Sequence, residues 1–338
     1  MHVKNTFIPE GYKSLLDVMQ TEKAIKYVKD TFEQIFAESI GLLRISAPLF
    51  VSADSGLNDN LNGVERPVSF GIKEIEGTDM EIVHSLAKWK RQALRDYGFQ
   101  PHEGLYTDMN AIRRDEEIDN LHSVYVDQWD WEKVILKEDR TREYLEGTVK
   151  IIVRALAATE LATCAMFPAL EPSINPRVTF VTSEELEEKY PDLTPKQRED
   201  AISRRFGTVF IENIGGALKS GLPHDGRAPD YDDWSLNGDI IVWNEVLGRA
   251  FEISSMGIRV DREAMLRQLK ISGCEERKQL PFHKALIEGN MPLSIGGGIG
   301  QSRICMLILK KCHIGEVQVS KWDEDTLRVC GQNGVFLL

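Results

Sequence analysis

The sequence has few cysteines and no long apolar run, and each shortage excludes a class of protein. Five cysteines are scattered over 338 residues without a Cys-x-x-Cys pair, which argues against a disulfide framework and a structural zinc site. The apolar runs at residues 151–158 and 304–309 are far shorter than the roughly 20 residues that span a bilayer. Polar residues follow Met1, where a secretory signal would have an apolar run. We therefore expect a cytoplasmic protein without a transmembrane helix.

Positive charge is also scarce. The chain has 41 Lys and Arg residues against 53 Asp and Glu residues, which gives a formal net charge of −12. Such a surface repels the phosphates of nucleic acids and anionic membranes, so neither is an expected partner. A local basic pocket for a nucleotide is compatible with this balance. The hydrophobic content of 42% is sufficient for a sizeable core.

The spacing of apolar residues predicts helices interleaved with strands. The clearest helix is at 21–41, with Thr21 as its cap and Gly41 at its end. Other helices are predicted from 85 onward and at 148–167, 183–206, 261–269, 283–288 and 302–311, and strands at 42–50, 68–75, 81–83, 121–131, 178–181, 208–211, 239–243 and 250–254, with a polar loop at 215–237. Pro48 places the strand 42–50 at a sheet edge or a bulge. We expect an α+β fold, a mostly antiparallel sheet flanked by helices, in one domain over residues 1–338.

One predicted strand carries polar residues that need partners. Alternation along residues 122–131 places Gln128 and Asp130 on one face, and Trp129 and Trp131 on the other. If both faces are covered, the two polar side chains need a polar environment, and a pocket for a small amino-bearing ligand would provide it. An edge strand with a solvated end is the alternative.

A predicted hairpin carries two acids. With its turn near residues 245–246, Asp239 and Glu252 lie opposite each other, where like charges are destabilising. A bridging Mg²⁺ would reverse this effect, because hard cations bind carboxylate oxygens, and Ser255 could add a hydroxyl ligand. Two exposed acids with a register shifted by one residue are the alternative.

A glycine run and several basic residues complete the candidates. Residues 294–303 form a glycine run that ends at Arg303 before an apolar helix, where backbone N–H groups could face an anion. A flexible loop is the other interpretation. Arg113 precedes the strand that begins at 121 and could reach the same pocket. Lys90 and Arg259 are further candidates for binding a carboxylate or a phosphate.

Several sequence blocks, in one order, resemble the ammonia-dependent asparagine synthetase (aspartate–ammonia ligase) family over essentially the whole chain. They are NDNL (58–61), HSLAKWKRQ (84–92), EGLYT (103–107), LHSVYVDQWDWE (121–132), RAPDYDDW (227–234), LNGDI (236–240), SSMGIRV (254–260) and IGGGIGQSR (295–303). The first helix, the proline-containing strand, the arginine-led hairpin and the glycine run also resemble the three motifs of class II aminoacyl-tRNA synthetases of the aspartyl and asparaginyl type.

This resemblance implies a class II synthetase-like catalytic domain. An anticodon-binding domain is not expected, because the segment before residue 21 is too short to form one. The implied reaction is the ATP-dependent amidation of L-aspartate to L-asparagine through a β-aspartyl-adenylate, with release of AMP and pyrophosphate. No cysteine near the N-terminus is placed to release ammonia from glutamine, so ammonium is the expected nitrogen source. The expected assembly is a homodimer built on the helix 21–41 and the Pro48 strand.

The resemblance also implies roles for individual residues. ATP would be bound by Arg113, Glu116, Asp239, Glu252 and Arg303, with Mg²⁺ on Asp239, Glu252 and Ser255. Aspartate would be bound by Asp59, Lys90, Gln128, Asp130 and Arg259. Asp59, Arg113 and Arg303 would be the catalytic residues, with Asp59 as the first choice for accepting a proton from ammonium.

Two other functions stay open at this stage. A shortened relative of the tRNA synthetases could transfer the amino acid to another acceptor. A non-catalytic sensor could bind asparagine or its adenylate and regulate a partner. The sensor predicts the loss of a phosphate-binding arginine or a magnesium-binding acid, and all of these residues are present.

Overall fold

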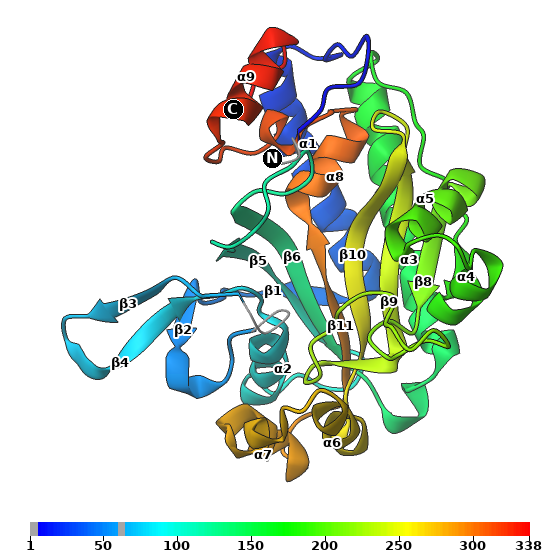
Figure 1. Cartoon of the computed structure of the whole chain (residues 1–338). Coiled ribbons are helices and arrows are strands. Elements are labelled where there is room, and N and C mark those ends of the chain that lie inside the picture. Colours follow the sequence, from blue (N-terminus) through cyan, green and yellow to red (C-terminus); the bar gives the residue numbers. More distant parts are fainter. Residues whose placement is uncertain (1–5, 60–64) are drawn as a thin grey trace.

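An eight-stranded sheet forms the centre of the computed structural model, which describes residues 6–59 and 65–338 (Figure 1). In spatial order its strands are β1 (Leu42–Arg44), β5 (Gly104–Ile112), β6 (Tyr125–Val134), β11 (Ser294–Gly300), β10 (Arg249–Arg259), β9 (Asp232–Asn244), β8 (Thr208–Glu212) and β7 (Thr179–Thr182). The pairs at the two edges, β1 with β5 and β7 with β8, are parallel, and the other pairs are antiparallel. The expected α+β fold with a mostly antiparallel sheet is thus confirmed.

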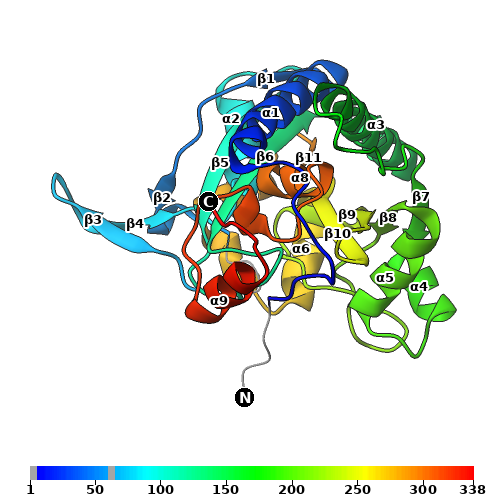
Figure 2. The ribbon, with the colours of Figure 1, turned by 90° about the horizontal axis from the view of Figure 1, so that it is seen from above.

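One face of this sheet is covered by long helices. Helices α1 (Val18–Ile40) and α3 (Arg142–Met166) lie along it (Figure 2), together with the shorter α8 (Gln301–Ile308). Phe32 and Phe36 of α1 pack against Trp129 and Trp131 of β6, and all four side chains are buried. Because side chains alternate along a strand, Gln128 and Asp130 point to the opposite face, as predicted from the sequence.

Smaller elements surround the sheet. The remaining helices are α2 (Ala87–Asp96), α4 (Ser183–Lys189), α5 (Pro195–Phe206), α6 (Arg262–Ile271), α7 (Pro281–Ile287) and α9 (Glu324–Gln332). Short 3₁₀ turns are η1 (Ala53–Ser55), η2 (Lys137–Asp139), η3 (Glu275–Gln279) and η4 (Ile314–Glu316). A second sheet of β2 (Phe50–Ser52), β4 (Ile75–Ile82) and β3 (Ser69–Ile72) projects from the main body as an arm (Figure 1). Within the described ranges, no helix has the length and apolar character needed to cross a membrane.

Several predicted boundaries are wrong. Helix α1 starts at Val18, because Asp17 and Gln20 form a capping box there, and Thr21 is buried inside the helix. The predicted strand 42–50 is split into β1 and β2, which belong to different sheets, although the predicted edge position of β1 is confirmed.

Three other predicted segments also differ. The predicted helix 183–206 is two helices, since Thr194 and Pro195 begin a new one. The strand predicted to begin at 121 begins at Tyr125. The loop predicted to extend to 237 ends earlier, because β9 begins at Asp232.

The glycine run is a strand and not a loop. Residues of β11 pair with β6 on one side and with β10 on the other, so their backbone groups are used in the sheet. Small residues are needed because side chains of neighbouring strands cross this one. A Cβ at Gly296 would lie 2.0 Å from Oε2 of Glu132, and a Cβ at Gly298 would lie 2.3 Å from Oε1 of Gln128. The prediction that these glycines present N–H groups to an anion is therefore wrong.

Candidate functional site

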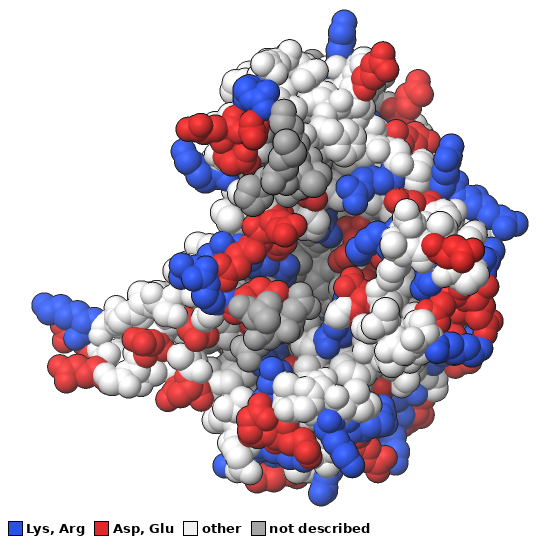
Figure 3. All heavy atoms as spheres, in the orientation of Figure 1, with Lys and Arg blue, Asp and Glu red and all other residues white. Residues whose placement is uncertain are grey.

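A cavity of about 530 Å³ lies on the sheet face opposite α1. Strands β6, β10 and β11 form its floor, and α2 and α5 contribute side chains to its walls. It is lined by every candidate side chain except that of Asp239, namely Asp59, Lys90, Arg113, Glu116, Gln128, Asp130, Glu252, Ser255, Arg259 and Arg303. Acidic and basic side chains are mixed around the hollow in the space-filling view (Figure 3). The fold thus brings together residues that are up to 244 positions apart in the sequence, from Asp59 to Arg303.

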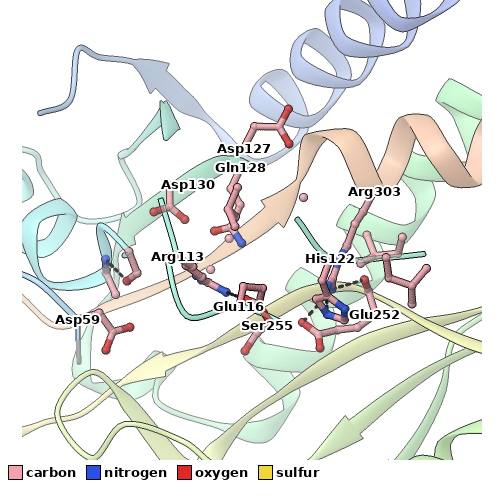
Figure 4. A pocket seen from close by; sticks show the side chains of 18 of the residues that line it. Asp59, Arg113, Glu116, His122, Asp127, Gln128, Asp130, Glu252, Ser255 and Arg303 are labelled. Atoms are coloured by element: carbon pink, nitrogen blue, oxygen red, sulfur yellow. Dashed lines mark hydrogen bonds and ion pairs between the residues drawn. The ribbon is translucent and has the colours of Figure 1, made fainter. Parts of the chain in front are cut away.

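The candidate residues are spread along the cavity. Asp59 lies at one end, Arg303 and Glu252 lie together at the other, and Arg113 lies between them (Figure 4). Gln128 and Asp130 project from the strand above Arg113 in the same view. The cavity therefore has two chemically different ends, which are described in turn.

Lys90 is a buried cation near the first end. Helix α2 places its Nζ 2.9 Å from the carbonyl oxygen of Gly297 and 3.3 Å from Oδ1 of Asp130. Its complete burial lowers the pKa of the ammonium group, and the charge of Asp130 opposes this effect. Asp130 also accepts a hydrogen bond from the backbone N–H of Leu86, just before α2. The lysine, the carboxylate and the helix are therefore held as one unit.

Arg259 is held by two carboxylates. Its Nε donates to both oxygens of Glu132, at 3.0 and 3.1 Å, and its Nη2 donates to Oε2 at 2.8 Å. Its Nη1 donates to Asp232. Arg259, Glu132 and Asp232 are all at most 2% exposed, so this trio is a buried group with a formal charge of −1. The adjacent Asp233 is also buried and is paired to Arg140.

Asp59 is connected to Arg113 through neighbouring residues. Asn58 Oδ1 accepts from the backbone N–H groups of Asp59 and His84, at 3.0 and 2.9 Å. The ring Nδ1 of His84 donates to the carbonyl of Asp59 at 3.0 Å, because a carbonyl oxygen can only accept. Nη2 of Arg113 donates to the carbonyl of His84 at 3.4 Å. Asp59 is 3% exposed. The pKa of Tyr231 is raised chiefly by the burial of that tyrosine and also by the charge of Asp59.

Arg303 is positioned by three contacts at the second end. Its Nη1 donates to the backbone carbonyl of Glu252 at 3.0 Å and lies 3.7 Å from Oε1 of that side chain. Its Nη2 donates to Nε2 of His122 at 2.8 Å, while Nδ1 of His122 lies 2.9 Å from Oδ1 of Asp119. A guanidinium has no acceptor, so Nε2 of His122 is the acceptor in this hydrogen bond, and Nδ1 faces Asp119. Arg113 lies 4.0 Å from Glu116 in the same region.

The two acids of the hairpin are not directly opposite each other. The pairing of Asn244 with Arg249 beside the turn already places Glu252 opposite Ile241, and a β-bulge between Glu252 and Ser254 then places Asp239 opposite Ser255. The predicted opposition of Asp239 and Glu252 is therefore wrong, although the two charges still interact. Burial, and the charge of Glu252, raise the pKa of Asp239 to about 6 against the opposing effect of Arg227. Burial also acts on Glu252, but its pKa is lowered overall by Arg303, Lys196 and Arg227.

The acids suit Mg²⁺ by donor type, but one is already occupied. Glu252 and Ser255 present oxygens to the cavity, whereas both carboxylate oxygens of Asp239 accept hydrogen bonds from Nη2 of Arg227. Across the described part of the chain, no three His, Cys, Asp or Glu side chains are arranged to hold a metal ion. The predicted magnesium ligands would therefore act together only after Arg227 has moved away.

Sequence reasoning gave no role to four residues that contact the candidate residues. They are His122, Glu132, Arg227 and Asp232. All four lie in the blocks 121–132 and 227–234, and that position is the signal that could have singled them out. His122 and Glu132 have partners more than 100 residues away, and Arg227 and Asp232 have partners 12 and 27 residues away on other segments, so spacing alone could not pair them.

The chain is similar to known proteins over nearly its whole length. A family model described as aspartate–ammonia ligase matches residues 19–334. The aspartate–ammonia ligase of Clostridium perfringens (strain 13) is 59% identical over 336 residues, which are 99% of this chain and 100% of that protein. The aspartate–ammonia ligase of Clostridium tetani is 59% identical over 331 residues, 98% of this chain and 97% of that protein.

Solved structures with a similar fold are tRNA synthetases. Asparaginyl-tRNA synthetase from Pyrococcus horikoshii, complexed with asparaginyl-adenylate, has a TM-score of 0.63 and 15% identity and covers 88% of this chain and 68% of its own. Asparaginyl-tRNA synthetase from Entamoeba histolytica has a TM-score of 0.62 and 13% identity, over 89% of this chain and 67% of its own. The fold is therefore that of the class II synthetases, as expected. Together with the full-length sequence matches, this shows that the chain belongs to the aspartate–ammonia ligase family of enzymes.

Proposed function

We propose that the protein converts L-aspartate, ammonia and ATP to L-asparagine, AMP and pyrophosphate through a β-aspartyl-adenylate. The observation that carries this proposal is the cavity itself. Its second end presents Arg303 and its middle presents Arg113, which suit phosphates, and its first end presents buried charges that suit a small zwitterion. The family and the synthetase fold support the same reaction class.

Adenylation solves the chemical problem of this reaction. A carboxylate is a poor electrophile, because its negative charge repels a nucleophile. In the first step, a β-carboxylate oxygen of aspartate attacks the α-phosphorus, and the bond to pyrophosphate breaks. In the second step, ammonia attacks the acyl carbon, and AMP leaves with the electron pair of the C–O bond. We assign the α-phosphate to Arg113, where negative charge develops, and the far phosphates or the adenine to Arg303.

Aspartate has to bind with its β-carboxylate toward Arg113. We assign its α-carboxylate to Lys90 and Arg259, and its ammonium group to Asp59, Gln128 and Asp130. The short spacing between Lys90 and Asp130 supports this arrangement, since a zwitterion would meet both charges there. Asp59 would also accept a proton from ammonium before the attack. Its link to Arg113 through His84 supports placing the proton acceptor near the adenylate.

Other parts of the proposal concern the site as a whole. Glu116 would complete the ATP site, and Mg²⁺, held by Asp239, Glu252 and Ser255, would neutralise phosphate charge when bound. We propose that residues 1–338 act as one catalytic domain without an anticodon-binding domain or a nucleic-acid partner. The eight-stranded sheet and the main hydrophobic cluster, which joins side chains from Leu16 to Val335, support a single domain. A cytoplasmic location and a homodimer belong to the same proposal.

Product analysis tests the reaction. The purified protein is incubated with ATP, L-aspartate and ¹⁵N-ammonium, and the products are identified by mass spectrometry and ³¹P NMR. We expect ¹⁵N-labelled asparagine with equal amounts of AMP and pyrophosphate, and little asparagine when glutamine replaces ammonium. Formation of ADP and phosphate would contradict the adenylate. Binding without turnover would favour the sensor.

A further inference from the structure

We propose that Arg227 is a built-in cation that occupies Asp239 in the ligand-free protein and keeps divalent metal ions out until nucleotide binds. The inference rests on the proposed function, because it takes Asp239 and Glu252 to lie in the ATP site. It goes further by giving a role to a residue outside the predicted site. It also explains why the predicted magnesium ligands are not assembled.

The contacts of Arg227 show that the carboxylate holds it in place. Its Nη2 donates to both oxygens of Asp239, and its Nη1 donates to the carbonyl of the adjacent Gly226 at 2.9 Å. Among the described residues, its buried Nε has no hydrogen-bond partner. An arginine that leaves a buried donor unsatisfied is not in its best possible environment. Its position is therefore set mainly by the charge of Asp239.

The acids need a cation at this position. Asp239 is 4% exposed at its side chain, and its charge interacts with that of Glu252 on the next strand. Two neighbouring carboxylates in a buried site are costly without positive charge between or beside them. The nearby Lys196 also acts on both acids through its charge, but its ion pairs are with Glu199 at 3.1 Å and Asp225 at 3.5 Å. Arg227 is the side chain that hydrogen-bonds to Asp239.

A metal ion and the guanidinium compete for the same oxygens. Divalent ions bind through carboxylate oxygens, and both oxygens of Asp239 face Arg227. A free ion would have to displace the guanidinium into the cavity without a new anionic partner. An ion that arrives with ATP brings phosphates, which supply that partner. Arg227 lines the cavity and is therefore placed to meet them.

Mn²⁺ binding in the absence of nucleotide tests this idea. Mn²⁺ is titrated into the full-length protein, and the unbound ion is measured by electron paramagnetic resonance. We expect weak binding to the wild type and binding that is roughly tenfold tighter or more in Arg227→Gln, since affinity for such ions depends strongly on the charge of the site. The added affinity should disappear in the double variant Arg227→Gln, Asp239→Asn.

Arg249→Gln is the matched control. Arg249 begins β10 and lines the same cavity, so its removal changes the overall charge equally. We expect no comparable gain in that variant. Equal Mn²⁺ affinity in the wild type and Arg227→Gln would overturn the proposal, and so would an equal gain in Arg249→Gln.

A destabilised variant does not prevent the test. If Arg227→Gln melts at low temperature, Mn²⁺ should raise its melting temperature much more than that of the wild type, because an ion that binds the folded state stabilises it. Arg227→Lys keeps the charge and should bind Mn²⁺ as weakly as the wild type. Failure of either expectation counts against Arg227. None of these measurements uses aspartate, ammonium or turnover, so a negative result would leave the proposed reaction standing.

Discussion

Individual cations in the cavity are paired with carboxylates from other segments, and this pairing determines how the substitution of each cation should affect ligand binding and activity. Arg303 at the second end is paired less tightly, since its hydrogen bonds go to a backbone carbonyl and to His122, and the Glu252 carboxylate lies 3.7 Å away. Its charge is therefore available for a ligand. Arg113 is similar, because its nearest carboxylate oxygen, on Glu116, is 4.0 Å away.

We therefore predict that Arg113→Ala and Arg303→Ala lose adenylate formation while keeping the fold. Removal of one charge-assisted donor to a developing phosphate charge typically lowers the rate by roughly 10²-fold or more. The measurement is aspartate-dependent pyrophosphate release, with circular dichroism to verify the fold. Arg249→Gln provides a comparison, as it removes a charge from the same cavity. Pyrophosphate release near the wild-type rate would exclude the altered arginine from the mechanism.

Lys90→Met and Asp59→Asn should fail in different steps. Loss of Lys90 should chiefly weaken aspartate binding, and its KM should rise, because the α-carboxylate loses its cation. Asp59→Asn should still form the adenylate slowly, but transfer to ammonia should become limiting. Hydroxylamine traps the intermediate as a hydroxamate, so the ratio of hydroxamate to asparagine separates the two steps. Identical defects in both variants, or an adenylate on the α-carboxylate, would contradict the assigned roles.

At the scale of elements, strand β11 depends on glycine for close packing. Gly296→Ala would place a Cβ 2.0 Å from Oε2 of Glu132 and 2.7 Å from Nη2 of Arg259, both in the buried charged trio. We predict a loss of about 1–3 kcal/mol in the free energy of unfolding, as for other overpacked sites, and a weaker affinity for aspartate. Gly71→Ala is the control, because its Cβ would meet open space. Urea denaturation of both variants measures the difference, and equal stability would refute the packing role.

Sequence patterns predicted some elements well and others poorly, for physical reasons. Alternation along β6 was reliable, because a strand covered on one face by α1 must separate its tryptophans from Gln128 and Asp130. The glycine run was misread, since glycine is required there to leave room for Glu132 and Gln128 of a neighbouring strand and not to form a local turn. The hairpin register was also missed, because the turn pairs Asn244 with Arg249 and a bulge at residues 252–254 adds a further shift, and neither leaves a local signature. Contacts across strands decide such features, and a single sequence does not record them.

At the scale of the whole molecule, the exposed apolar side chains bear on assembly. The apolar face of α1 is not available to a partner, because Ala24, Val28, Phe32 and Phe36 are buried inside the protein. The expected homodimer therefore cannot use the apolar face of this helix, and the edge of the sheet is the surface that remains for it. Leu43 of β1 is 62% exposed and Leu49, just before β2, is 51% exposed.

We predict a two-fold homodimer that buries the edge around β1 and the segment leading to β2. Leu43 and Leu49 lie close in sequence to the exposed Phe50, so a second copy could cover them together, and isologous pairing is the commonest symmetric solution. Leu43→Glu with Leu49→Glu should convert the dimer to a monomer, because burying two carboxylates against an apolar partner is costly. Ile271→Glu, on α6 and 65% exposed, should leave the assembly unchanged. Multi-angle light scattering at micromolar concentration measures the mass. A monomeric wild type would refute the dimer. A double variant that stays dimeric would show that the interface does not include Leu43 and Leu49.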